Sequence, residues 1–498
     1  MRQRRYRGLG PATASLGSLV FLFVLLAHPA PGWTQGGISV HGFLREHVSF
    51  NTQDPPEIEG DDAWSLSMAR SVAYVEISAQ YDWGGITLIG RGDYEPETAY
   101  LERLGDLSNK DYQNYYSDAD LREYYLDLYL GKYVTARLGK QQVVWGRSDF
   151  FRGMDIVNGF DYSWRSFLEV ENEQLRKPLV LANVQVEIPR LKGKLQGLLR
   201  PGLDRSYDIG NTYELSGGRW ANQPNKGFDF LPLVPYNYAH PSGDKDDVGY
   251  GFRWAGTAGS VEYTMAYLHT FNLDPVVNSS FAPFEQAPKG LAEFIYPNVD
   301  LVGFTLNKDF KALDIVGRAE VSLTFDQPYN VGSNFFGGAL PGFGGITRKN
   351  TLRWMLAFDK QLRGAQKVFG ASRPAFFNFQ VFDSWLLDYD KEKDDIVDLA
   401  GYGAPKRTHS MFFTTILAWN YRNDRINPSL AAGIDNNGEG FIIPAVEFVR
   451  GDHWRLKLEY DWFLWKNEKL PQQIENRTHL IGYFAHNSQL AVRVTYQF

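Results

Sequence analysis

The sequence contains no cysteine among its 498 residues. Disulfides, thiolate catalysis, zinc sites with cysteine ligands and c-type haem attachment are therefore excluded. Beyond residue 27 the sequence also lacks any run of about 18 apolar residues, the length that a transmembrane helix needs. The remaining choices are a protein in aqueous surroundings or one that enters a membrane as strands, because only helices and closed barrels satisfy their backbone groups in lipid.

The N-terminus predicts export. A basic stretch with four arginines in residues 2–7 precedes the apolar run Leu16–Ala27, and a small-x-small cleavage site follows at residues 30–32. About twelve apolar residues cannot cross a hydrocarbon core of ~30 Å as a helix, so we predict a cleaved signal peptide over residues 1–32 and a mature domain over 33–498. A retained anchor is the alternative. Removing four arginines from a formal charge of −7 leaves about −11, which argues against a nucleic-acid partner.

Aromatic residues and glycine are abundant, whereas methionine is scarce. The chain has 28 Tyr, 34 Phe, 13 Trp and 48 Gly, but only 6 Met, and its mean hydropathy is negative. Outer-membrane barrels have such compositions because only one face of each strand meets lipid and because aromatic side chains collect at the two lipid–water interfaces. The composition therefore favours a barrel over several soluble domains.

The C-terminus alternates perfectly between apolar and polar positions. One parity holds Leu490, Val492, Val494, Tyr496 and Phe498, whereas the other holds residues such as Arg493 and Gln497. This alternation predicts a half-buried strand with a lipid face and a lumen face. A strand that ends on an aromatic residue resembles the signal that the barrel-assembly machinery recognises. A soluble β-protein that ends in a strand is the alternative.

The same alternation recurs along the whole chain. About nineteen segments show it: 38–50, 66–82, 84–94, 123–130, 134–145, 180–188, 194–201, 247–255, 260–271, 298–307, 313–325, 350–360, 376–387, 408–420, 427–434, 440–449, 453–465, 477–485 and 490–498. Short turns separate many of them, for example Gly131-Lys132, Gly256–Gly259, Lys308–Phe310, Asn436–Gly440 and Gly451-Asp452. Tight turns force antiparallel neighbours, so we predict an all-β, up-and-down transmembrane barrel. Bacterial barrels have even strand numbers, so at least one segment is wrong and we expect 16 to 18 strands.

Long polar or glycine-rich stretches lie between the strands. They cover residues 97–120, 202–246, 272–297, 326–349 and 388–407, and we expect them to form loops on the outer rim.

Motifs for catalysis or cofactor binding are missing. The sequence has no HExxH, GxSxG or phosphate-binding loop, and its nine histidines form no ligand-like pair. The glycine-rich Phe335–Gly345 is predicted to be a loop, Asp388–Asp395 a solvated loop and Asp435–Glu439 a hairpin turn rather than a calcium site. We therefore expect no enzyme, no cofactor and no metal.

One region combines fading alternation with charges of both signs. Between residues 137 and 165, a strand leads into a charged segment that could fold into the lumen and pair with inward groups on neighbouring strands. The candidate residues are Glu123, Asp127, Arg137, Arg147, Asp149, Arg152, Asp155, Asp161 and Arg165. Such a charge ring could be a constriction that sorts solutes, or an ion-pair network that fills and stiffens the lumen.

These residues also carry a family resemblance. Leu121–Tyr129, Leu138–Gly146, Asp149 and Arg152–Asn158 resemble the "domain of unknown function 1302" family, with Asn158-Gly159-Phe160-Asp161 where that family tends to have Asn-Pro followed by Asp. The resemblance implies an outer-membrane protein of proteobacteria, often encoded beside an RND-type exporter and a periplasmic partner.

Three functions remain open at this point. The first is a pore or export conduit that passes small hydrophilic or amphipathic solutes passively through a polar lumen. The second is a closed, structural or receptor-like barrel whose outer loops bind a partner. The third, a lipid-modifying enzyme, has only the barrel in its favour. In each case the expected surroundings are outer-membrane lipid in a Gram-negative bacterium.

Overall fold

The computed structural model describes residues 37–498, except 56–59, 170, 205–208, 216, 222–233, 282–283, 286, 288–289, 333–341, 399–403 and 466–480. The predicted signal peptide, residues 1–32, lies outside the described residues, as does most of the glycine-rich loop at 335–345. None of the helices among the described residues is long and apolar enough to cross a membrane.

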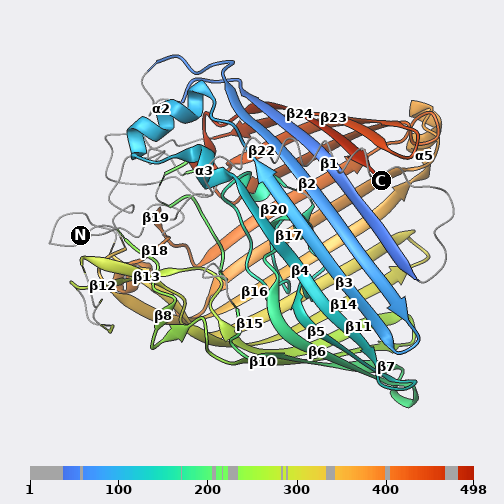
Figure 1. Cartoon of the computed structure of the whole chain (residues 1–498), viewed down its shortest axis with the longest axis horizontal. Helices are drawn as coiled ribbons and strands as arrows, with labels where there is room; N and C mark the ends of the chain where they lie inside the picture. The colour runs from blue at the N-terminus through green and yellow to red at the C-terminus, as the bar shows by residue number, and fades with distance from the viewer. Residues whose placement is uncertain are drawn as a thin grey trace.

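Eighteen long strands of the described chain form one closed antiparallel barrel (Figure 1). In chain order they are β1 (Ile38–Asn51), β2 (Leu66–Tyr81), β3 (Gly84–Tyr94), β4 (Asp118–Tyr129), β5 (Val134–Gln141), β6 (Leu179–Ile188), β7 (Gly193–Arg200), β10 (Gly249–Ala258), β11 (Val261–Phe271), β14 (Asn298–Phe310), β15 (Ile315–Val331), β16 (Ile346–Leu362), β17 (Ala375–Leu386), β20 (His409–Ala418), β21 (Ile426–Asp435), β22 (Gly440–Arg450), β23 (Trp454–Leu464) and β24 (Gln489–Gln497). Each pairs with its neighbours along the chain, and β24 pairs with β1. The strand number is the upper value expected from the sequence.

The last strand has the two faces that its sequence predicts. Leu490 is exposed and Val492, Val494 and Tyr496 are half-buried, whereas the residues between them are buried. Beyond the strand, the backbone N–H of Phe498 donates to Gly42 O, and Gly42 N–H donates back to Phe498 O, both at 3.0 Å. The C-terminal residue therefore extends the seam that closes the barrel.

The two rims differ in the length of their connections. The rim that carries Ile38 and Phe498 has short turns, whereas the opposite rim carries all five long stretches predicted as loops. One predicted turn, Lys308–Phe310, lies inside β14, and the β14–β15 turn follows it. The hairpin at Asn436–Gly440 is confirmed, with Gly438 at a φ of +87°, but it lies on the long-loop rim.

One of the nineteen predicted strands, residues 477–485, is wrong over its described part. Residues 477–480 of that segment lie outside the described residues, and 481–485 form a turn around the 3-10 helix η4 (Gly482–Phe484). Alternation is a weak signal over so short a stretch, and here Phe484 instead packs against Phe463 and Trp220, with ring centroids 5.9 Å apart in both pairs.

Short elements between the barrel strands were not predicted. They are α2 (Ala99–Ser108), α3 (Tyr112–Tyr116), η1 (Ser166–Leu168), α4 (Asn172–Leu175), η2 (Pro189–Leu191), β8 (Ala239–His240), β9 (Gly243–Asp244), β12 (Val276–Ser279), β13 (Ala292–Ile295), α5 (Arg363–Phe369), α6 (Lys391–Asp394), β18 (Ile396–Asp398) and β19 (Ala404–Pro405). The helix α2 begins at Thr98, whose side chain accepts from Leu101 N–H, and buries Tyr100 and Leu104 against the rim. The helix α6 lies within the segment predicted as a solvated loop, and none of its residues is buried.

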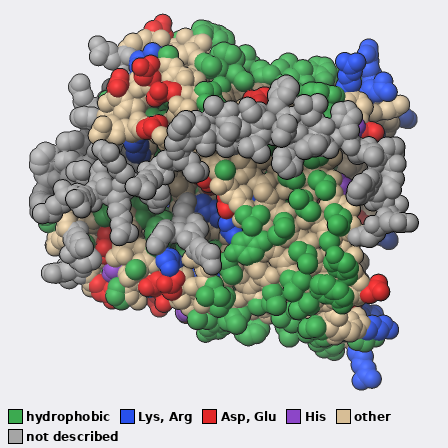
Figure 2. Space-filling view, in the orientation of Figure 1, with side chains coloured by type: hydrophobic (Ala, Val, Ile, Leu, Met, Phe, Trp, Pro, Cys, Tyr) green, Lys and Arg blue, Asp and Glu red, His purple; other side chains and the backbone are tan. Residues whose placement is uncertain are grey.

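The outer wall has the surface of a membrane-spanning barrel (Figure 2). Its middle carries exposed apolar side chains: Ile77, Ile86, Leu88, Val302, Phe304, Leu356 and Leu458. Exposed aromatic residues lie near the short-turn ends of the strands (Tyr81, Trp83, Tyr133, Phe310, Trp454) and near the long-loop ends (Tyr94, Tyr250, Phe325, Trp385, Trp462). An apolar band between two aromatic girdles is the lipid-facing pattern of transmembrane barrels, whose short turns face the periplasm.

Candidate constriction in the barrel lumen

A long segment between β5 and β6 folds into the barrel, as the sequence predicts. This inner segment comprises residues 142–178, of which 170 is not described. Its entry and exit are joined by Asn158, whose side chain accepts from Val143 N–H at 2.9 Å and donates to Lys177 O at 2.8 Å. At its start, the Gln142 side chain donates to Glu123 of β4 at 2.7 Å. The inner segment is thus tied to itself and to the wall that it leaves.

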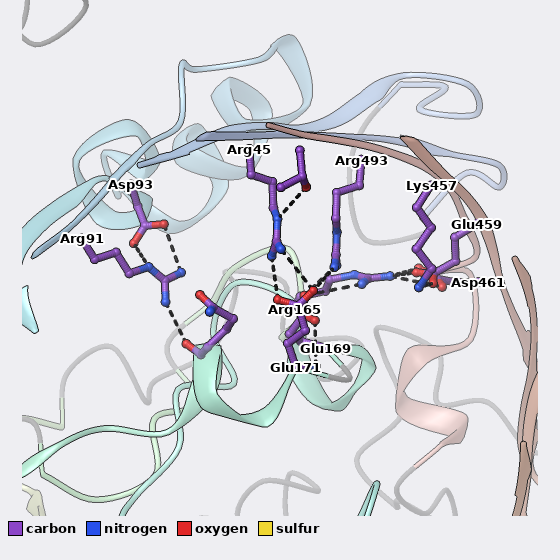
Figure 3. A network of polar contacts seen from close by, with 12 residues as sticks. Arg45, Arg91, Asp93, Arg165, Glu169, Glu171, Lys457, Glu459, Asp461 and Arg493 are labelled. Carbon is purple, nitrogen blue, oxygen red and sulfur yellow. Dashed lines mark hydrogen bonds and ion pairs between the residues drawn. The ribbon is translucent and has the colours of Figure 1, made fainter. Parts of the chain in front are cut away.

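On one side the inner segment is held by a buried ion-pair network (Figure 3). Arg165 reaches β23, where it pairs with Glu459 and, at 3.3 Å, with Asp461. It also lies 3.8 Å from Glu169 of its own segment, and Glu169 accepts from Arg493 of β24 at 2.7 Å. These five side chains are at most 8% exposed.

The same network continues to β1. Arg45 donates to both carboxylate oxygens of Glu171, at 3.0 and 3.1 Å, and Arg493 donates to Glu171 at 3.2 Å. In Figure 3, Arg45 and Arg493 extend from the wall strands toward Glu169 and Glu171 of the inner segment. Bidentate arginine–carboxylate pairs fix orientation as well as distance, so the segment has a defined position against β1, β23 and β24.

Neighbouring charges keep Arg165 and Glu169 ionised although both side chains are buried. Burial alone would lower the pKa of Arg165, yet the surrounding carboxylates of Glu459, Asp461 and Glu169 raise it above its ordinary value. Burial would raise the pKa of Glu169, but Arg493 and Arg165 hold it below its ordinary value. Arg165 and Glu169 therefore stay charged near neutral pH.

A second part of the wall, β15, β16 and β17, also holds the segment. Asp149 pairs with Arg318 of β15 at 3.3 Å, and Arg318 pairs in turn with Asp359 of β16 at 2.9 Å. The Gln380 side chain of β17 also donates to Asp149. Glu320 of β15 accepts from backbone N–H groups of the segment, including Met154 N–H at 2.9 Å. The inner segment is therefore anchored to two separate parts of the wall, both distant from the β5–β6 edge where it leaves and rejoins it.

Apolar side chains fill part of the space between these anchors. Phe150, Phe151 and Phe167 of the segment pack among inward aromatic residues of β17, β20, β22 and β23. Their partners on the wall are Phe382, Phe412, Phe441 and Phe463, with the Phe151 and Phe412 ring centroids 4.6 Å apart. Trp145 is buried on the other side and donates from Nε1 to Gln196 at 3.0 Å. This packing makes the segment part of the folded core.

Cavities remain on both sides of the inner segment. Toward the long loops a cavity of about 300 Å³ is lined by Phe150, Tyr162, Tyr213, Asp274 and Lys406, among others. Toward the short turns, a cavity of about 470 Å³ is lined mainly by charged residues of the wall and of the segment. These lining residues include Arg45, Glu171, Glu447, Arg455, Lys457 and Arg493. A cavity thus lies on each side of the inner segment.

The predicted wall residues do not pair with the charges of the inner segment. Asp127 and Arg137 pair with each other across β4 and β5, at 2.7 and 3.0 Å, and Arg137 lies over the Tyr125 ring at 3.9 Å. Glu123 binds the uncharged Gln142. The expected pairing of Asp127 and Arg137 with the segment is wrong because directly opposed positions on neighbouring strands are closer to each other than to the lumen centre.

The other predicted residues occupy different surroundings. Arg147 pairs at 3.3 Å with Glu262 of β11, with both side chains more than half exposed. Asp155 pairs with Arg176 inside the segment. Arg152 donates to Phe150 O at 3.2 Å and lies over the Phe160 ring at 4.1 Å. Asp161 accepts from Ser163 N–H at 2.9 Å, which shapes a turn.

Sequence reasoning missed most of the partners on the wall. Arg45, Glu169, Glu171, Arg318, Glu459 and Asp461 were not singled out, although the lumen position of Arg493 was predicted correctly. Strand parity carried a signal for the wall residues, because Glu459 and Asp461 alternate with exposed Leu458 and Trp462.

The sequence as a whole matches one protein family. The family profile described as "Protein of unknown function (DUF1302)" matches residues 60–191 and 209–498, which include the inner segment. The chain belongs to the DUF1302 family. The resemblance seen in the residues around β4, β5 and the inner segment is therefore confirmed over most of the chain. No curated protein matches this DUF1302 sequence.

Solved outer-membrane proteins have a similar fold. They include OccAB3 of Acinetobacter baumannii (8% identity, TM-score 0.45), OpdK of Pseudomonas aeruginosa with vanillate (9%, 0.46) and OccK9 (OpdG) of Pseudomonas aeruginosa (9%, 0.47). Each alignment covers 93% of this DUF1302 chain and 99%, 98% and 97% of the other chain, respectively. At such identities and TM-scores the likeness says nothing about the solute of the DUF1302 protein.

Proposed function

We propose that this DUF1302 protein is an outer-membrane channel that passes small hydrophilic or amphipathic solutes passively. The observation that carries the proposal is the inner segment, which lies between two cavities of the barrel lumen and lines one with Arg152 and the other with Glu171 and Glu173. A barrel of 18 strands is wide enough to hold water unless loops fill it. The inner segment would then set the width and the charge of the narrowest part.

The mechanism requires no chemistry from the side chains. A solute enters one cavity down its gradient, meets charges of both signs at the inner segment, and leaves through the other cavity. Because Arg45, Arg493 and the carboxylates between them hold one another in place, they present a fixed pattern of potential. Fixed charges discriminate solutes better than mobile ones, since their orientation costs nothing when the solute arrives.

Location and partners form part of the same proposal. The apolar wall, the aromatic girdles and the N-terminal export signal support insertion into the outer membrane after cleavage near residue 32. We propose that the barrel-assembly machinery recognises the strand that ends at Phe498. Family resemblance supports coupling to an RND-type exporter through a periplasmic partner, which would meet the short-turn rim.

A closed barrel is the second candidate, and the aromatic packing around Phe151 and Phe167 favours it. Single-channel recording of the mature protein in planar bilayers separates the two candidates. Stepwise currents support the channel. A protein that migrates differently on gels before and after boiling, and is thus folded, yet carries no current would favour the closed barrel with a binding role for its loops.

A further inference from the structure

The barrel wall is interrupted between β4 and β6. Strand β5 pairs with β4 only over Tyr124–Tyr129, so the first six residues of β4, Asp118–Glu123, pair with β3 alone. Beyond Gln141 the chain turns into the lumen and returns to the wall at Leu179, where β6 begins. In the part of the chain that is described, no strand occupies the place beside Asp118–Glu123.

A large cavity lies at this interruption. Its volume is about 1310 Å³, and its lining includes Asp93 and the two arginines that pair with it, Arg70 and Arg91, all on the lumen side of the wall. The same lining includes residues of the lipid-facing row of the wall, Tyr124 and Val180. A cavity lined from both faces of a single-layered wall crosses that wall. Figure 2 shows charged side chains in the middle of this side of the barrel, next to the hydrophobic surface.

Lys140 lies at the edge of the gap that is nearer to the short-turn rim. It follows inward-facing Gly139 and exposed Leu138 on β5, so its side chain starts on the lipid face. Its Nζ nevertheless lies 2.9 Å from Asp120, which sits opposite the lumen-facing Arg91 across β3 and β4. A side chain from the outer face can reach a carboxylate on the inner face only around a free strand edge.

The gap lies at the depth of the lipid leaflet next to the long loops. Lys140 is six residues from Val134 at the short-turn end of β5. That separation is about 20 Å along the strand and roughly 15 Å along the membrane normal at a tilt of about 40°, within an apolar band ~25 Å tall. The interruption therefore begins above the middle of the bilayer and continues toward the outer surface.

The chemistry of the lining changes from the outside to the inside. Leu121 and Leu203 are 49% and 65% exposed at the mouth of the cavity. The charged residues of the lining run from exposed Asp118 and Asp120 to buried Arg70 and Asp204, and they balance: Arg70, Arg91, Arg122, Lys140 and Lys177 against Asp93, Asp118, Asp120, Asp161 and Asp204. A ligand with an apolar chain and a polar head of no net charge matches this sequence of surfaces, because a net charge would face as many repulsive as attractive groups.

We propose that this gap is a lateral opening through which a single-chain, zwitterionic amphiphile passes between the outer leaflet and the lumen. The inference rests on the proposed channel function and names one solute class for it. The apolar chain would lie along Leu121 and Leu203, and the head would sit among the paired charges around Arg70, Arg91 and Asp93. Entry from the leaflet spares the amphiphile the transfer of its chain through water.

Photo-crosslinking tests the opening. The full mature barrel is placed in vesicles that contain lysophosphatidylcholine with a photoreactive group near its head, and the attachment sites are mapped by mass spectrometry. We expect crosslinks to Trp164 and Gln174, which line the cavity on its lumen side. Crosslinks confined to the outer wall would overturn the proposal.

Two cysteine variants decide the route, since the native chain has no cysteine to interfere. L121C, labelled with a bulky maleimide, obstructs the mouth of the cavity, whereas L199C labels a lipid-facing residue of β7 that is 47% exposed and outside the cavity. We expect the lumen crosslinks to be lost in labelled L121C and kept in labelled L199C. Lumen crosslinks that survive in labelled L121C would show entry from the rim and refute the lateral route.

The failure of this proposal and the failure of the channel are distinguishable. Single-channel currents without lumen crosslinks would leave the channel standing and remove the opening. Lumen crosslinks that depend on Leu121, in a barrel without ion current, would support the opening and reject a continuous pore.

Discussion

Replacing Arg165 should destabilise the barrel far more than replacing Arg147, although both belong to the same inner segment. The Arg165 side chain is 3% exposed, and Asp461, which is 1% exposed, loses this cation in R165Q. Removing one partner of a buried pair costs roughly 3–5 kcal/mol, because the other charge remains buried. Glu169 keeps Arg493 and Glu459 keeps Lys457, so we expect about 3 kcal/mol, the lower end of that range.

R147Q is the matched control. Arg147 pairs with Glu262 at 3.3 Å, but the two side chains are 54% and 55% exposed, and such pairs contribute up to about 1 kcal/mol. Equilibrium unfolding by guanidinium in detergent micelles, followed by tryptophan fluorescence, gives the free energy of unfolding for each variant. Adding D461N to R165Q should restore part of the loss by removing the uncompensated charge. Equal destabilisation by R165Q and R147Q, or no effect of R165Q, would refute the ion-pair account of the inner segment.

Three further predictions concern other parts of the molecule. Deleting Phe498 removes its backbone bonds to Gly42 and should lower the fraction of heat-modifiable barrel in outer-membrane preparations; an unchanged fraction would contradict a role in assembly. Burial raises the pKa of Glu214 to about 7, so the folded loop binds a proton that the unfolded loop releases near pH 4.5. The free energy that holds this loop packed should therefore fall by up to about 3 kcal/mol as the pH rises from 4.5 to 7. The loss should appear as faster maleimide labelling of A221C relative to the exposed V368C. The E214Q substitution should abolish this pH dependence. R318Q leaves Asp149 without its arginine and should shift the reversal potential in a KCl gradient toward cation selectivity, whereas R363Q, in an exposed pair on the short-turn rim, should not.

The barrel itself could be predicted because each strand carries its own evidence. Alternation over residues such as Leu490–Phe498 gives both the strand and its two faces without knowledge of its neighbours. Strand ends were less certain, since the last residues of β14 and the first of β4 look like turn or loop in isolation. Helices as short as α3, Tyr112–Tyr116, are not stable alone and form here because Tyr112 and Tyr116 are buried against the rim.

The inner segment could be predicted only in part. Charges of both signs near Arg147 and Arg165 marked it, but their partners are distant in sequence: Glu459 is 294 residues from Arg165, and Gln380 is 231 residues from Asp149. Which strands face each other across a barrel depends on its closure and strand number, which local periodicity does not contain. The gap beside β4 was missed for a related reason, because β5 ends, and β6 begins, six residues short of the long-loop end of β4.

The most direct test asks whether the inner segment lines an open pathway. A cysteine is placed at Arg147, which is exposed in the lumen, and at Val368, which is 77% exposed on the short-turn rim. Each variant is recorded as a single channel while a water-soluble, cationic methanethiosulfonate reagent is added. The account predicts a stepwise change in current for R147C and none for V368C. A folded barrel without current, or a current that is the same before and after R147C is modified, would contradict it.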